Sequence, residues 1–273
     1  MIPIPFDPEI HLGPFSLAWH GIFTAVGIFF GVWLSVKLVT AQARISEADA
    51  NAIAFWGVVG GIIGARVFHV ADCWTACASV PDGYVHHLEL IPQIWTGGIA
   101  VWGAALGGVL GGLIVALRRG TVPIGFGADA AAPGISLGFA IGRIGDIING
   151  EHHATACDAP FGICVGYTNP STLGQPGPVH LAVAYDMAWT SLGVALVLLL
   201  MRTALARAPQ GRIFWTWVLW YTLGRFMLGF LRVGDPTPIL GLRQDQLVAV
   251  IAATVALPAL VLVQTNVLPG SLP

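Results

Sequence analysis

The chain has 273 residues, of which 56% are hydrophobic and 10% are charged, and its formal net charge is −2. Soluble domains carry about 25% charged residues, so this composition, with a mean hydropathy of +0.78, excludes a soluble globular protein and predicts an integral membrane protein. The balance of 12 basic and 14 acidic residues gives no nucleic-acid signature. Residues 1 to 14 contain no Lys or Arg and so lack the charged region of a cleavable signal peptide; we expect Met1 to be retained.

Apolar runs long enough to cross a bilayer, about 20 residues each, recur along the whole chain. We therefore expect an all-α integral membrane protein with about seven transmembrane helices, which form a single transmembrane domain over residues 1–273. The predicted spans, in chain order, are 16 to 36, 51 to 70, 97 to 117, 128 to 148, 182 to 201, 213 to 232 and 246 to 264.

Basic residues between the predicted spans indicate the orientation. The loops 71–96 and 149–181 contain no Lys or Arg, whereas the connections after the first, third and fifth spans contain Lys37 and Arg44, Arg118 and Arg119, and Arg202, Arg207 and Arg212. Cytoplasmic loops are enriched in Lys and Arg, so we expect the N-terminus outside, the C-terminus in the cytoplasm, and both arginine-free loops facing outward. Arg232 and Arg243, which flank the last connection, are the exceptions.

Three arginines, Arg66, Arg143 and Arg225, fall at membrane depth rather than in a predicted cytoplasmic loop. An arginine in hydrocarbon costs about 2.5 to 3.5 kcal/mol on insertion scales, so each needs a partner or a function. Arg66 lies near the outer end of its span, where a long side chain can reach the interface. Arg143 and Arg225 lie on spans that approach the outer face, and two arginines directed at one site form a bidentate clamp for a phosphate.

The segment from Gly138 to Ala154 groups polar residues at the end of the fourth predicted span. It reads GFAIGRIGDIINGEHHA and places Arg143, Asp146, Asn149 and Glu151 close together along the chain. Arg143 and Asp146 are three residues apart and share one side of a helix, while the glycines between them allow a ligand or another backbone to approach. The simpler interpretation is an internal Arg143–Asp146 ion pair that joins helices, which leaves Asn149 and Glu151 unexplained.

All four cysteines lie in the two loops predicted to face outward: Cys73, Cys77, Cys157 and Cys164. An even number of cysteines on the oxidising side favours disulfides. A zinc site that includes loop histidines is one alternative and free thiols are the other, although CxxxC and CxxxxxxC are not specific zinc spacings.

With these features, the chain resembles the bacterial prolipoprotein diacylglyceryl transferase family. The family signature, GR-G-N-hydrophobic-hydrophobic-N-G-E, is met by Gly142, Arg143, Gly145, Asn149, Gly150 and Glu151. The resemblance continues in order over nearly the whole chain, at Gly64, Ala65 and Arg66, Gly97 and Gly98, Val179 and His180, Tyr185 and Asp186, Tyr221, Gly224, Arg225 and Phe226, Arg232 and Asp235, and Gln246.

Several polar residues of the family pattern are replaced in this chain. The signature Asn is Asp146, the third-span histidine is Trp102, the first-span tyrosine is His20, and the Glu four residues after Arg225 is Gly229. The chain therefore resembles a divergent member of the family. The alternative is a catalytically altered paralogue that binds phospholipid or uses a different acceptor.

The resemblance implies an enzyme that transfers the diacylglyceryl group of phosphatidylglycerol to the lipobox cysteine thiol of a preprolipoprotein, the first step of lipoprotein maturation. It also implies a multi-pass protein of the bacterial plasma (inner) membrane. The expected partners are phosphatidylglycerol, the preprolipoprotein signal peptide with its lipobox Cys, and the lipid bilayer. No nucleic acid, cofactor or metal is expected.

Because the nucleophile belongs to the substrate, such an enzyme must supply a clamp for the leaving phosphate and a base for the thiol. The resemblance assigns Arg143 and Arg225 to the phosphate, and Asn149 and Glu151 to the head group or to orienting those arginines. The other residues expected to bind substrate are Arg66, Asp146 and Tyr221.

Without a histidine at position 102, His20 is the predicted base, because imidazole titrates near neutral pH. A histidine at the membrane interface with no catalytic role is the alternative. Glu151 and the pair His152 and His153 are weaker candidates for the base. Asp146, beside Arg143, is also a candidate to take over the partner role of the family Glu, which is replaced here by Gly229.

Overall fold

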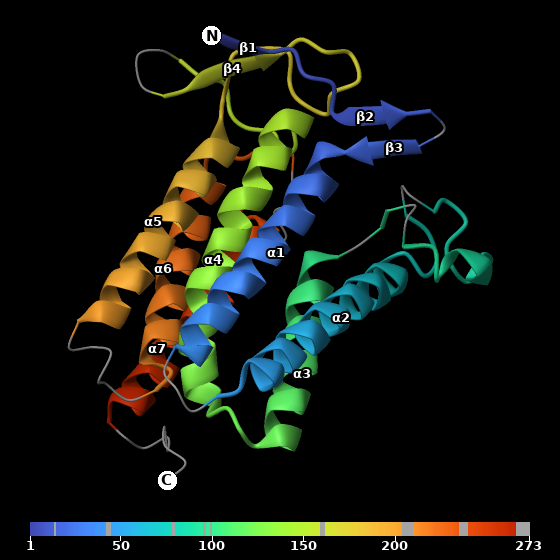
Figure 1. The fold of residues 1–273 in the computed structure, drawn as a ribbon. Helices are drawn as coiled ribbons and strands as arrows, with labels where there is room; N and C mark the ends of the chain where they lie inside the picture. Colours follow the sequence, from blue (N-terminus) through green and yellow to red (C-terminus); the bar gives the residue numbers. More distant parts are fainter. Residues whose placement is uncertain are drawn as a thin grey trace. The chain divides into compact units, whose positions relative to one another are not determined.

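The computed structural model describes residues 1–13, 15–41, 45–77, 80–94, 97–98, 100–158, 162–203, 210–234 and 240–265. The chain forms two compact units, one from Met1–Leu38 with Gly125–Pro273 and the other from Val39–Ile124 (Figure 1). The expectation of a single transmembrane domain stays a prediction. Arg44, Arg207 and Asp235, which entered the sequence argument, lie outside the described residues.

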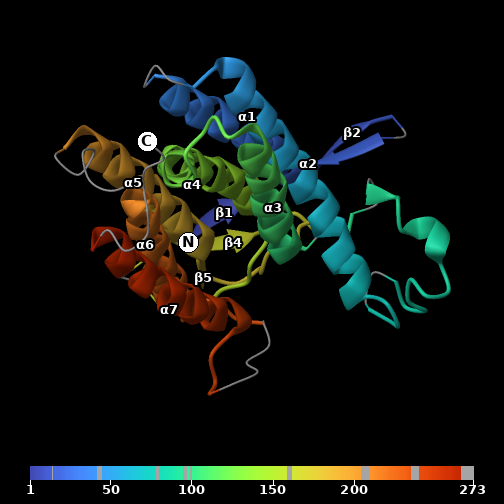
Figure 2. The ribbon, with the colours of Figure 1, turned by 90° about the horizontal axis from the view of Figure 1, so that it is seen from below.

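The larger unit is a helical bundle of α1 (Trp19–Thr40), α4 (Ile124–Asn149), α5 (Ala182–Arg202), α6 (Arg212–Gly229) and α7 (Gln244–Gln264). Helix α6 lies between α5 and α7, as both views show (Figures 1 and 2). Glycines bring α1 and α4 together, since a Cβ added at Gly27 would lie 2.6 Å from the carbonyl oxygen of Gly138. Small residues at facing positions are a usual means of close packing between apolar helices.

A pair of tryptophans fixes the register between α5 and α6. The rings of Trp189 and Trp220 stack with their centroids 4.1 Å apart. Each indole N–H also donates a hydrogen bond to the backbone carbonyl of the other residue, at 2.9 Å and 3.2 Å. Asp186, one turn before Trp189, and Arg225, just over one turn after Trp220, therefore lie at the same end of the two helices.

Five short strands lie at the end of the bundle where α4 ends (Figure 1). Strands β1 (Ile2–Ile4), β4 (Cys164–Tyr167) and β5 (Val179–His180) form a sheet in the order β1-β4-β5, with β1 parallel and β5 antiparallel to β4. Strands β2 (Glu9–Leu12) and β3 (Phe15–Ala18) form a hairpin that leads into α1. The chain is thus mostly helical rather than all-α, and its strands are too short for sequence alternation to reveal them.

The smaller unit consists of α2 (Glu47–Asp72), the 3-10 helix η1 (Leu88–Leu90) and α3 (Val101–Arg119). Helix α2 begins at Ser46, whose side chain accepts a hydrogen bond from the backbone N–H of Asp49, as is usual for an N-cap. Helices α2 and α3 pack through glycines, and a Cβ at Gly61 would lie 3.3 Å from the carbonyl oxygen of Ala104. The many glycines of the third predicted span therefore serve helix packing.

Within the described residues, five helices are long and apolar enough to cross a membrane: α1, α2, α4, α5 and α7. Helices α3 and α6, of 19 and 18 residues, lie at two further predicted spans. The sixth predicted span runs to residue 232, but α6 ends at Gly229, so Arg232 follows the helix. The full count of seven spans and the orientation stay predictions.

Candidate active site

The site is built around Arg143, near the end of α4. Its Nη1 lies 2.5 Å from Oδ2 of Asp146, one turn further along the helix. Its Nε lies 2.8 Å from Oδ2 of Asp186, at the start of α5. The internal ion pair suggested as the simpler interpretation is therefore present, but Arg143 also joins a larger charged group.

Asp186 gathers three arginines from three segments. Its Oδ2 accepts contacts from Nε of Arg143 at 2.8 Å, Nη1 of Arg225 at 3.1 Å and Nη2 of Arg232 at 3.3 Å. The carboxylate is 1% exposed, so burial makes each of these charges costly unless it is paired. Arg143 and Arg225, the two arginines predicted to form a clamp, do converge.

Asp245, at the start of α7, gives the cluster a second carboxylate. Its Oδ2 lies 3.4 Å from Nη2 of Arg225 and 3.9 Å from Nη1 of Arg232. Burial, together with the guanidinium groups of Arg225 and Arg143, lowers the pKa of Arg232 to about 10. Three guanidinium groups therefore lie close together here, an arrangement that suits an anion.

His20, in the first turn of α1, lies against the end of α4. Its Nδ1 is 2.5 Å from Oδ1 of Asp146 and 3.6 Å from Oε2 of Glu151. Gly145 permits this approach, since a Cβ at position 145 would lie 2.6 Å from the Cα of His20. The His20 side chain is 40% exposed, so its ring remains accessible although one nitrogen faces two carboxylates.

Asn149 and Glu151 lie beside this histidine. Nδ2 of Asn149 donates to Oε1 of Glu151 at 3.4 Å. Oδ1 of Asn149 is buried and has no hydrogen-bond partner among the described residues. Burial is the main cause that raises the pKa of Glu151. The predicted residues His20, Arg143, Asp146, Asn149, Glu151 and Arg225 thus lie in one connected network.

Residues 9–262, which include this network, match the family model for prolipoprotein diacylglyceryl transferase. The chain belongs to the prolipoprotein diacylglyceryl transferase family. A phosphatidylglycerol–prolipoprotein diacylglyceryl transferase of Frankia alni is 34% identical over 280 residues, which cover 100% of this chain and 70% of that protein. Phosphatidylglycerol–prolipoprotein diacylglyceryl transferase 1 of Streptomyces coelicolor is 36% identical, over 96% of this chain and 73% of that protein. The enzyme of the same name from Synechococcus elongatus is 35% identical, over 98% of this chain and 90% of that protein. The resemblance seen in the sequence is therefore confirmed.

Tyr221 belongs to the same unit of this transferase-family chain, in the interior of the bundle. Its ring lies 5.3 Å from that of Phe139 and 5.9 Å from that of Trp217, measured between centroids. These aromatic contacts hold the partly buried ring of Tyr221 in place by packing. Its predicted role in substrate binding stays a prediction.

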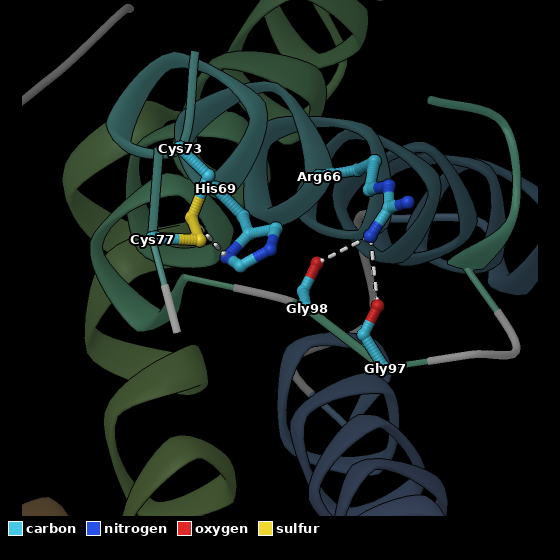
Figure 3. The surroundings of a disulfide bond; sticks show 6 residues. All are labelled: Arg66, His69, Cys73, Cys77, Gly97 and Gly98. Atoms are coloured by element: carbon cyan, nitrogen blue, oxygen red, sulfur yellow. Dashed lines mark hydrogen bonds between the residues drawn. A yellow bond between two sulfur atoms is a disulfide. The ribbon is translucent and has the colours of Figure 1, made fainter. Parts of the chain in front are cut away.

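Arg66 lies in the smaller unit and donates hydrogen bonds to backbone carbonyls, of which Figure 3 shows those of Gly97 and Gly98. Its Nε donates to the carbonyl of Ile91 at 2.7 Å, its Nη1 to those of Gly97 and Gly98 at 2.7 and 2.8 Å, and its Nη2 to that of Leu90 at 2.5 Å. Four of the five N–H groups of the guanidinium are thereby used. We interpret Arg66 as an anchor for this loop, while its predicted contact with substrate stays a prediction.

The cysteines form two disulfides, Cys73–Cys77 and Cys157–Cys164, which confirms the preferred interpretation of their positions. His69 lies beside the first, with Nδ1 3.9 Å from Sγ of Cys73 (Figure 3). Two groups within the described residues have metal-ligand chemistry, His69 with that disulfide and His20 with Asp146 and Glu151. The disulfide occupies the thiols of the first, and Arg143 already pairs with Asp146 in the second, so we assign no metal.

Sequence reasoning omitted three members of the charged cluster from the site: Asp186, Arg232 and Asp245. Two signals in the sequence could have found two of them. Asp186 and Arg232 both lie at positions where the chain resembles the family, and Arg232 was an exception to the charge rule for cytoplasmic loops. Trp102 stands where the family has histidine, but its side chain lies outside the described part of the chain.

Proposed function

We propose that this chain transfers the diacylglyceryl group of phosphatidylglycerol to the lipobox cysteine thiol of a preprolipoprotein signal peptide, the first step of lipoprotein maturation. The relatives are named phosphatidylglycerol–prolipoprotein diacylglyceryl transferases, which supports the donor lipid, the transferred group and a prolipoprotein acceptor. The observation that carries the proposal is the convergence of Arg143 and Arg225 on Asp186, at 2.8 and 3.1 Å. Two planar guanidinium groups held at one point suit the oxygens of a phosphate.

In the proposed reaction, the thiolate sulfur attacks the glycerol carbon that carries the phosphate ester oxygen. A C–S bond forms and the C–O bond breaks, with its electron pair leaving on the oxygen of glycerol phosphate. Negative charge therefore develops on the phosphate, where Arg143 and Arg225 are held ready to stabilise it. Asn149 and Glu151 are proposed to bind the glycerol head group, and Arg66 and Tyr221 to support lipid binding.

His20 is proposed to accept the thiol proton. Oδ1 of Asp146 accepts from Nδ1 of His20 at 2.5 Å, so the proton of the neutral ring resides on Nδ1 and the lone pair on Nε2. A carboxylate that orients a histidine in this way also stabilises the imidazolium that forms. Glu151, at 3.6 Å from the same nitrogen, adds a second carboxylate.

The proposed setting is the bacterial plasma (inner) membrane, with seven spans, the N-terminus and loops 71–96 and 149–181 outside, and the C-terminus in the cytoplasm. The arginine-free outer loops and their disulfides support this orientation. A membrane-impermeant thiol label should reach all four cysteines in intact cells after reduction. Labelling that requires broken membranes would reverse the orientation.

A paralogue that binds phospholipid without transferring it is the second candidate, because Trp102 replaces the family histidine. Complementation distinguishes the two. If the chain is a transferase, it restores lipoprotein modification in cells depleted of their own enzyme, and Arg225→Lys does not. Binding of phosphatidylglycerol with no restoration by the parent chain would favour the paralogue.

A further inference from the structure

His152, the residue after Glu151, has an unusual backbone conformation with φ at 65°. Among the described non-glycine residues, only Leu240 shares the left-handed region. Such conformations persist where surrounding contacts impose them, and they cluster at functional sites. Gly150, two residues earlier, also has a positive φ of 79°. The chain thus turns back at the end of α4 and brings the His152 ring to Arg143.

The contacts of this ring define its hydrogen-bonding role. Nε2 of His152 lies 3.1 Å from Nη1 of Arg143 and 3.8 Å from Oδ2 of Asp146. A guanidinium offers only donors, so Nε2 must accept and carries no proton, and the proton of the neutral ring is on Nδ1. Partial burial and the guanidinium groups of Arg232 and Arg143 lower the pKa of His152 to about 4, although 35% of the side chain is exposed, and the ring is neutral at physiological pH.

Charged groups face His152 from four segments of the larger unit. They are Arg143 and Asp146 of α4, Asp186 of α5, Arg225 of α6, and Arg232 after α6. Guanidinium groups outnumber carboxylates in this set, which disfavours a proton on the ring. A phosphate held by Arg143 and Arg225 would offset the excess positive charge and supply an acceptor, and both effects favour the imidazolium.

We propose that His152 is a positioning residue for the lipid phosphate: its neutral ring orients Arg143 through Nε2, and it takes up a proton when a phosphate ester binds. Asp146 and Asp186 already offset the charge of Arg143, and a neutral acceptor orients the arginine without adding a third negative charge that would compete with the anion. The proposal rests on the proposed function for the identity of the ligand as a phospholipid.

Three substitutions of His152 separate the role of its hydrogen-bond acceptor from the effect of its left-handed backbone conformation. His152→Gln places an amide oxygen within reach of the Nε2 position and does not titrate. His152→Gly relieves the backbone but removes the acceptor, and His152→Leu removes the acceptor but keeps bulk. His153→Gln is the matched control, since Nε2 of His153 lies instead 2.7 Å from the carbonyl oxygen of Leu173.

The test is phosphatidylglycerol binding by the full chain in phosphatidylcholine nanodiscs at pH 5 and pH 7.5. A group whose pKa rises on binding adds affinity as the pH falls, so the parent and His153→Gln should bind roughly threefold to tenfold more tightly at pH 5. His152→Gln should match the parent at pH 7.5 and lose that gain. His152→Gly and His152→Leu should bind at least about tenfold more weakly at pH 7.5. Because His20 titrates in every variant, the difference between the parent and His152→Gln isolates His152.

Two results would overturn the inference: the parent's pH dependence retained in His152→Gln, or parental affinity at pH 7.5 in both His152→Gly and His152→Leu. Transfer to a lipobox peptide, measured in parallel, tests the proposed function by itself. Binding that depends on His152 without transfer by the parent overturns only the proposed function. Transfer without the pH effect overturns only the inference, and a parent that binds no phosphatidylglycerol overturns both.

Discussion

Arg66 and Arg143 are both arginines on apolar helices, and they are stabilised in different ways. In the smaller unit, Arg66 donates four hydrogen bonds to main-chain carbonyls and lies 5.3 Å from the ring centre of Tyr84. In the larger unit, Arg143 contacts the carboxylates of Asp146 and Asp186 and the ring of His152. The guanidinium of Arg66 is used to hold a loop through carbonyl acceptors. In the charged cluster around Arg143, by contrast, an arriving anion can replace one of the carboxylate partners. An arginine at membrane depth is therefore evidence of function only when its partners are themselves charged.

The largest expected effect concerns His20, on the larger unit. At pH 7 a thiol of pKa about 8.5 is only a few per cent ionised, so His20→Ala should slow transfer by roughly 10² to 10⁴-fold. Raising the pH toward about 8.5 should restore part of the rate, because the substrate thiol then ionises without a base. His69→Ala on α2 is the control and should leave the pH profile unchanged. Full activity of His20→Ala would place the base elsewhere, with Glu151 next in line.

Lysine substitutions test the comparison itself. Arg143→Lys or Arg225→Lys keeps the charge but loses the planar fork, and should lower kcat/KM by about 10²-fold. Arg66→Lys should change activity by less than about threefold but lower the free energy of unfolding by about 1 to 3 kcal/mol, because part-buried carbonyls lose their donors. Thermal unfolding in detergent and a transfer assay separate the two outcomes. Equal tolerance of lysine at all three positions would make every one of these arginines structural.

Two glycines of α4 sharpen the role of the His20 contact. In Gly145→Ala the new Cβ would lie 2.6 Å from the Cα of His20, whereas in Gly142→Ala the nearest atom, Oγ1 of Thr24, is 4.0 Å away. We expect Gly145→Ala to reduce the transfer rate by about tenfold through displacement of the base, and Gly142→Ala to stay near the parental rate. Equal transfer rates in the two variants would show that catalysis does not depend on the position of His20.

The smallest expected effect separates the two disulfides. Cys157–Cys164 closes a loop next to Ala154, which pairs with Arg232, whereas Cys73–Cys77 closes the end of α2 in the other unit. Loss of either short crosslink should cost about 2 kcal/mol of stability. The pair Cys157→Ser and Cys164→Ser should also reduce transfer a few-fold, while Cys73→Ser and Cys77→Ser should not. The reverse pattern would connect the smaller unit to the chemistry.

The sequence predicted those features that depend on local pattern. Apolar length located the helices, and the position of the cysteines predicted disulfides, although not which cysteines pair. Charge at membrane depth singled out Arg66, Arg143 and Arg225. The contact of His20 with Asp146 joins residues 126 positions apart. Periodicity can assign residues to a helix face but cannot say which helix that face meets. Asp186 was missed as a site residue for the same reason, since its importance comes from arginines on other segments.

The five strands were missed for a different reason. A strand of two to four residues, such as β5 at Val179–His180, has no room for a detectable alternation. Strand β4 pairs with β1 at the start of the chain, where Ile2 lies opposite Val165. It also pairs with β5, which follows it in the sequence, where Cys164 lies opposite His180. Such pairing depends on the packed bundle beneath it rather than on local sequence.

The most direct test of the central claim is the fate of a lipobox peptide incubated with the parent chain in phosphatidylglycerol nanodiscs. The peptide is analysed by mass spectrometry, and the aqueous phase is analysed for phosphate ester. We predict a peptide that gains one diacylglyceryl group on its cysteine, an equal amount of glycerol phosphate, and neither product with Arg225→Lys. An unmodified peptide, with phosphatidylglycerol bound to the same preparation, would contradict the claim and leave a lipid-binding protein in its place.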